Sequence, residues 1–165
     1  CSSGAIQQLA ENKIDDVSDF IVLFYNPNIF PESEYTKRMQ EQIKYCEKLG
    51  VKYAVLEYDH DAWRDAVHGY ESAPERGPRC SLCFEYRFRR AVKFARENGY
   101  NAIASVLGVS RHKSQSQVDE SAQNVCDDIK YIPVKWDEGL RVQINRESEF
   151  YRQNYCGCEF SIRKI

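Results

Sequence analysis

Short runs of β-branched and aromatic residues alternate with longer amphipathic stretches along this chain, and this alternation limits the folds that it can adopt. Runs such as FIVLFYN and KYAVLEY are apolar nearly throughout, which is typical of parallel strands that are covered on both faces. Parallel strands need long crossover connections, and helices between the runs would supply them. We therefore expect an α/β fold, namely a Rossmann-like, open and mostly parallel sheet with helices on both faces.

The positions of the elements follow from the same pattern. The stretch SGAIQQLAENK indicates a helix near the start, and because the helix of a βαβ unit follows a strand, the first strand of the sheet is expected to lie before residue 1. Cys1 would then lie at a strand-to-helix turn, at the carboxyl edge where such sheets bind ligands. Strands are expected at residues 20–26, 52–58, 101–107 and 129–134, and helices at residues 31–50 and 78–99 and after Ser114.

Length and charge restrict the class of protein. The chain has 165 residues, about one ordinary domain, so we expect a single α/β domain over residues 1–165. No apolar run approaches the roughly 20 residues that span a membrane, and no charged segment followed by an apolar one indicates a secretory signal. The formal net charge is −2, so binding to nucleic acid would need a local basic face.

Cysteine is the most informative residue type. The chain contains seven cysteines, an odd number that excludes complete pairing within the chain. The spacings C-x2-C and C-x-C are poorly suited to disulfides that close long loops, but they direct two sulfurs at one metal or cluster. We therefore expect a reducing, cytoplasmic setting. Cys46 and Cys126 lie in apolar helical contexts and are expected in the core.

The remaining close pairs are candidate ligands. Cys80 and Cys83 lie at the expected start of a helix, whose amino terminus favours ionised thiols; the alternative is that they are half-buried apolar residues. Cys156 and Cys158 flank Gly157, which has no Cβ and lets the backbone bend tightly. Four thiolates satisfy either a structural zinc ion or an iron–sulfur cluster.

Polar residues near strand ends are weaker candidates. His112, in the stretch SRHK after an expected strand, could donate a proton or could be a solvated loop residue, and Arg111 beside it could contact phosphate. The amides of Asn26 and Asn28 could contact a base edge or could only form the turn around Pro27.

Other polar residues point more weakly to a function. His60 and His68 are expected at the surface around a helix. A basic series on one helix is either a solvated face or a track for phosphates, and it consists of Arg87, Arg89, Arg90, Lys93 and Arg96.

Four segments of the chain resemble signature segments of the QueH-type epoxyqueuosine reductases in order and spacing: FYNPNIFPESEYTKR, RCSLCFEYR, SVLGVSRHKS and FYRQNYCGCEFS. The opening CSSGAI resembles the tail of the C-C-x-P-C-like motif of that family, so Cys1 would be its last cysteine, and the preceding pair is absent from this sequence. The resemblance implies reduction of epoxyqueuosine to queuosine at the anticodon wobble position of tRNA, using a 4Fe-4S cluster and a second, mononuclear metal such as iron or zinc.

The resemblance also implies partners and ligands. Cys80, Cys83, Cys156 and Cys158 would hold the cluster, and Cys1 would join the metal ligands. Epoxide deoxygenation needs electrons that no side chain supplies reversibly, so a cofactor must provide them. We expect tRNA carrying epoxyqueuosine and an unidentified electron donor as partners, and no membrane. Two alternatives are a zinc-stabilised nucleic-acid-binding module without redox activity, and a thiol–disulfide oxidoreductase, which would leave the C-G-C pair unexplained.

Overall fold

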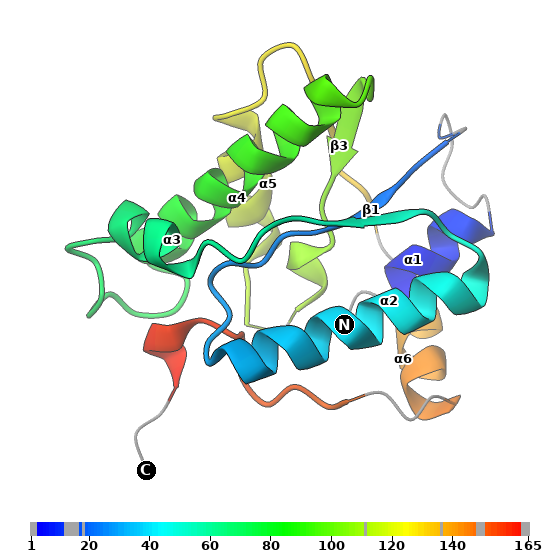
Figure 1. The fold of residues 1–165 in the computed structure, drawn as a ribbon, viewed down its shortest axis with the longest axis horizontal. Coiled ribbons are helices and arrows are strands. Elements are labelled where there is room, and N and C mark those ends of the chain that lie inside the picture. Colours follow the sequence, from blue (N-terminus) through cyan, green and yellow to red (C-terminus); the bar gives the residue numbers. More distant parts are fainter. Residues whose placement is uncertain are drawn as a thin grey trace.

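The computed structural model describes residues 3–11, 17, 19–110, 112–135, 137–147 and 151–162 (Figure 1). All four expected strands form, each shorter than its apolar run, and they pair in parallel: β1 with β2 and β3 with β4. The prediction of an α/β fold with parallel strands is confirmed. The strands are β1 (Val22–Phe24), β2 (Tyr53–Val55), β3 (Ala102–Ala104) and β4 (Lys130–Ile132).

Helices connect the strands. The long α2 ends where Gly50 adopts a left-handed conformation with φ of 65°, which glycine tolerates best, so this stop was predictable. α6 was not predicted. The helices are α1 (Ser3–Ala10), α2 (Glu32–Leu49), α3 (His60–Ala66), α4 (Pro78–Glu97), α5 (Gln115–Gln123) and α6 (Glu138–Glu147), with 3-10 turns η1 (Leu107–Val109) and η2 (Glu159–Ser161). None of the helices in the described ranges is long and apolar enough to cross a membrane.

The helices cover the strands from two directions (Figure 1). α4 and α5 pack together against β3 and β4 through Phe84, Phe88 and Val118. A separate cluster joins β1 and the turn after it to α2, and it consists of Phe24, Ile29 and Tyr35.

A further cluster joins α1, α2 and α6. Ile6, Tyr45, Cys46 and Ile144 form it, and Cys46 is fully buried, which confirms its predicted place in the core. Cys126 is half-buried and packs against Val92, Ala95 and Ile129.

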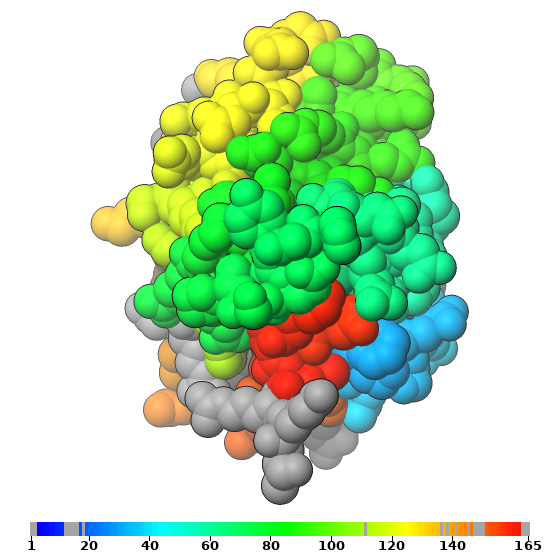
Figure 2. Space-filling view, turned by 90° about the vertical axis from the view of Figure 1, so that its left-hand side faces the viewer, coloured from blue at the N-terminus to red at the C-terminus, as the bar shows by residue number. Residues whose placement is uncertain are grey.

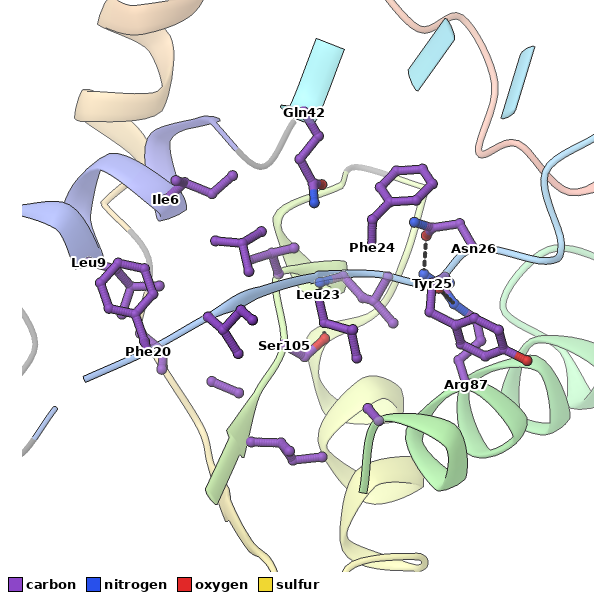
Figure 3. Close-up of a pocket in the computed structure, with 18 of the residues that line it drawn as sticks. Ile6, Leu9, Phe20, Leu23, Phe24, Tyr25, Asn26, Gln42, Arg87 and Ser105 are labelled. Atoms are coloured by element: carbon purple, nitrogen blue, oxygen red, sulfur yellow. Dashed lines mark hydrogen bonds between the residues drawn. The ribbon is translucent and has the colours of Figure 1, made fainter. Parts of the chain in front are cut away.

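Within the described residues the strands form two separate two-stranded sheets, β1–β2 and β3–β4. A cavity of about 480 Å³ lies between them and is lined by residues of both β1 and β3 (Figure 3). The apolar side chains Ile6, Leu9 and Phe20 stand toward one end of this cavity, and Asn26 and Arg87 stand toward the other. The predicted strand before residue 1 lies outside the described residues and stays a prediction.

The segment after α6 returns to the turn that follows β1. The backbone of Ile29 forms an antiparallel bridge with Cys158, and the amide of Phe30 donates to the Gly157 carbonyl over 3.0 Å. Arg38 of α2 donates to the carbonyls of Tyr155 and Cys156 over 3.3 and 3.4 Å. These bonds fix the C-terminal cysteines beside the carboxyl end of β1.

Candidate functional site

The structure brings Cys80, Cys83, Cys156 and Cys158 to one pocket, although the two pairs are far apart in the sequence. Cys80 and Cys83 lie one turn apart in the first turns of α4, which begins at Pro78 in the position where a missing amide costs least. Cys83 and Cys158 are buried and pack together in one cluster, and Cys156 packs against it.

Gly157 permits this approach of the C-terminal segment. Its φ of 99° is in the left-handed region, and a Cβ there would lie 2.8 Å from Nη1 of Arg38 and 2.9 Å from Cγ1 of Ile29. A larger residue would therefore push the segment away from the turn after β1.

The residue types of the pocket fit a thiolate-bound metal. Four soft thiolates are the donor set of zinc and iron–sulfur centres, and all four line one small space. Within the described ranges, however, no group of three or more His, Cys, Asp or Glu side chains is already arranged to hold a metal ion. The pocket measures about 20 Å³, room for roughly one water molecule. Binding a cluster would thus require these thiols to move apart.

The thiols differ in their readiness to ionise. Hydrogen bonds with the Cys158 side chain, with Ser161 and with the Cys158 amide lower the pKa of Cys156 despite its burial. The hydrogen bond between the two cysteine side chains, together with burial, raises the pKa of Cys158. Burial also raises the pKa of Cys80, which is opposite in direction to the effect expected from the helix amino terminus.

Positive side chains surround the pocket. Arg79 and Arg87 line it while being only 2% and 8% exposed, and the half-buried Lys113 lines both this pocket and the larger cavity. Burial lowers the pKa of Lys113, and Arg87 lowers it further, whereas Cys156 and Cys83 raise it. Sequence reasoning named no role for Lys113 or Arg79; the position of Lys113 directly after His112 in SRHK was the available indication.

The basic series on α4 is neither a solvated face nor a phosphate track as a whole. Arg87 is buried, and its guanidinium donates to the Tyr25 carbonyl over 3.3 Å and to Oδ1 of Asn26 (Figure 3). The other four cations form ion pairs with carboxylates: Arg89 with Glu85, Arg90 with Glu57, Lys93 with Glu97 and Arg96 with Asp128.

The predicted substrate residues have different surroundings. Asn28 is 4% exposed, lines both cavities, and its side-chain oxygen has no hydrogen-bond partner in the described part of the chain. His112 lines the cysteine pocket, and its Nδ1 lies 3.7 Å from a carboxylate oxygen of Glu75. Asn26 lines only the larger cavity, and its oxygen accepts from Arg87. Cys1 and Arg111 lie outside the described residues.

An aromatic clamp that sequence reasoning missed holds the C-terminal segment against α3. The Trp63 ring, fully buried, stacks between His60 and Phe160 at centroid distances of 5.3 and 5.9 Å. The prediction that His60 lies at the surface is wrong, because its ring contacts the Pro27 carbonyl at 2.6 Å and Glu159 at 3.2 Å. Figure 2 shows the segment, in red, seated between the region of α3 and α4 and the start of α2.

Comparisons with known proteins place the chain in one family. The family model described as "Epoxyqueuosine reductase QueH" matches residues 1–164. Proteins named epoxyqueuosine reductase QueH from Histophilus somni and Acinetobacter baylyi are 38% and 37% identical to the chain, cover 99% of it, and are themselves covered over 68% and 76% of their lengths. The protein of that name from Thermotoga maritima is 30% identical, over 88% of this chain and 81% of its own length.

Proposed function

This chain belongs to the QueH family of epoxyqueuosine reductases, and we propose that its cysteine pocket holds the metal centre of the reaction. The proposed substrate is epoxyqueuosine at the wobble position of a tRNA anticodon. Deoxygenation breaks the two carbon–oxygen bonds of the epoxide, forms a carbon–carbon double bond and releases the oxygen as water. Two electrons and two protons are consumed, so the protein needs an electron-carrying cofactor and an external donor, which is still unidentified.

The observation that carries the proposal is the meeting of four thiols from two distant segments in a pocket with buried cations. Cys80, Cys83, Cys156 and Cys158 would hold a 4Fe-4S cluster, which supplies electrons when bound. A second, mononuclear metal, iron or zinc, would use further ligands, and Cys1 is the proposed candidate. Thiolate ligation of this kind suits a reducing compartment, so we propose a cytoplasmic protein.

Polar residues at the pocket have complementary proposed roles. His112 carries an imidazole, a side chain that often transfers protons in enzymes, and lies at the pocket wall, so it is the proposed donor to the departing oxygen. The side-chain oxygen of Asn28, which has no hydrogen-bond partner among the residues that the structure describes, is available to accept from the substrate. Asn26 retains only its amide nitrogen for this purpose, because its oxygen is bonded to Arg87. Arg111 is proposed to contact the tRNA backbone.

Replacement of one thiol tests this proposal. Cys158→Ser in the full-length protein should remove bound iron and conversion of epoxyqueuosine, while circular dichroism stays close to that of the parent, because the packed clusters of the α/β core need no metal. Cys126→Ser is the matched control, since that thiol packs in a different cluster. Retained turnover in Cys158→Ser would exclude this thiol from the centre. If the parent protein holds zinc instead of iron and Cys158→Ser unfolds, a zinc-stabilised module would be favoured.

A further inference from the structure

Three cationic side chains at the cysteine pocket lack an acidic partner in the described part of the chain. Arg79 donates to the backbone carbonyls of Glu71 and Ala73, and Arg87 donates to the Tyr25 carbonyl. For these arginines and for Lys113, no carboxylate in the described ranges lies at ion-pair distance, and the buried Nε of Arg79 has no hydrogen-bond partner there. Among the described residues that line the pocket, the one carboxylate is Glu75, which lies beside His112.

Unpaired positive charge in a protein interior is costly, because water no longer solvates it. A pocket with three such side chains therefore favours a negatively charged occupant or negatively charged walls. The four thiols that line the same pocket become negative when they are ionised as metal ligands. The excess positive charge and the four thiols are thus complementary.

Lys113 differs from the two arginines. Both arginines use their guanidinium groups to hold backbone carbonyls, so they have evident roles in the fold. The side chain of Lys113 has no hydrogen bond or ion pair with the described residues, yet it lines both the cysteine pocket and the larger cavity. A half-buried ammonium without a partner among the described residues is the group most available to the occupant of the pocket.

We propose that Lys113 is an electrostatic positioning residue whose ammonium offsets the negative charge of the thiolate-bound iron centre and raises its reduction potential. The inference rests on the proposed function, because it requires that centre. Reduction adds an electron to an already negative group, and a nearby positive charge makes that step more favourable. Lys113 would thereby help the centre to accept electrons from the donor and would act through the centre without contacting the epoxide.

The test is a redox titration of the anaerobically loaded full-length protein, followed by visible absorbance and electron paramagnetic resonance. Lys113→Met should make one-electron reduction about tenfold less favourable, a shift of about 59 mV to more negative potential. Lys113→Arg keeps the charge and should stay near the parent value. Lys93→Met is the matched control, since it removes an equal charge from the exposed side of α4, where Lys93 lies 3.8 Å from Glu97.

Each outcome decides the matter. A negative shift in Lys113→Met alone supports the inference, and so does loss of iron from a folded Lys113→Met protein when Lys113→Arg retains it. An unchanged potential in iron-loaded Lys113→Met overturns the inference and leaves the proposed function standing. Equal shifts in Lys113→Met and Lys113→Arg also overturn it, because shape and not charge would then be responsible. A parent that binds no iron overturns the proposed function and the inference together.

Discussion

At the scale of single residues, Gly157 has the clearest structural requirement. It combines a φ of 99° with contacts that leave no space for a Cβ, and it separates the two C-terminal thiols. Gly99 has a similar φ of 75° but nothing within 4 Å of its Cβ position. Substituting each glycine by alanine therefore distinguishes the cost of backbone strain, which both sites share, from the cost of a steric clash, which only Gly157 has.

Gly157→Ala should lower the free energy of unfolding by about 2–3 kcal/mol and reduce iron loading, because the C-terminal segment must shift. Gly99→Ala should cost only about 1 kcal/mol of strain and leave iron loading intact. Urea unfolding and iron analysis of both variants would measure these effects. Equal losses in the two variants would show that the close contact at Gly157 has no special importance.

The hydroxyl of Tyr58 should make the stability of the fold depend on pH in the alkaline range. Its hydroxyl donates to the Ile29 carbonyl over 2.6 Å, and burial, followed by the charge of Glu32, raises its pKa to about 12. The unfolded chain ionises first, near pH 10. The contribution of Tyr58 is therefore complete below about pH 10 and is lost as the pH rises toward about 12.

Urea midpoints measured from pH 8 to pH 11 should fall more steeply in the parent than in Tyr58→Phe. Tyr70→Phe, at a residue that is 44% exposed, is the control and should follow the parent. If the urea midpoint of Tyr58→Phe fell as steeply with pH as that of the parent, ionisation of Tyr58 would not be the cause of the loss of stability at alkaline pH.

At the scale of elements, the sequence located those whose pattern is local. The four strands appear because their apolar runs suit buried parallel pairs, and α2 stops at a glycine that can adopt a positive φ. α6 was missed because Leu140, Val142 and Ile144 alternate with polar residues, as in a strand. Packing settles the matter, since Leu140 and Ile144 share one helical face against the α1–α2 cluster while Val142 is 38% exposed.

The candidate site was predictable in part. The cysteine spacings identified the four thiols that line one pocket, but the clamp on α3 depends on partners far along the chain. His60 meets Glu159 across 99 residues, and no local pattern around His60 indicates that contact. The buried Arg87 was misjudged for the same reason, because Arg89 and Arg90 beside it on α4 are both ion-paired, and Arg89 is exposed.

The clamp should keep the C-terminal segment ordered. Phe160→Ala removes the ring that stacks on Trp63, so hydrogen exchange in residues 151–162 should accelerate about tenfold while α2 and α4 stay protected. Ile162→Ala, at a residue of the same segment that is 43% exposed, should change little. Unchanged exchange in Phe160→Ala would mean that the hydrogen bonds donated by the Phe30 amide and the Arg38 guanidinium suffice to hold the segment.

At the scale of the whole molecule, the two parallel strand pairs and the helices beside them bring the candidate site residues into one region. The large cavity between β1 and β3 is lined in part by Cys156, Lys113 and Asn28, which also line the cysteine pocket, so the two spaces lie side by side. Sequence patterns predicted parallel strands but could not show how the two described pairs are spaced, because spacing depends on contacts between distant segments. The carboxyl ends of β1 and β3 nevertheless lie where an open α/β fold places its ligands.

The most direct test of the account is metal and sulfide analysis of the full-length protein purified without oxygen, together with its visible spectrum. We predict a brown protein with about four iron atoms and four sulfides in the cluster, and loss of both in Cys80→Ser of α4 and in Cys156→Ser of the C-terminal segment. Losses in both variants would show that the two segments bind one centre. A colourless protein that contains zinc alone, or iron that survives both substitutions, would contradict the account.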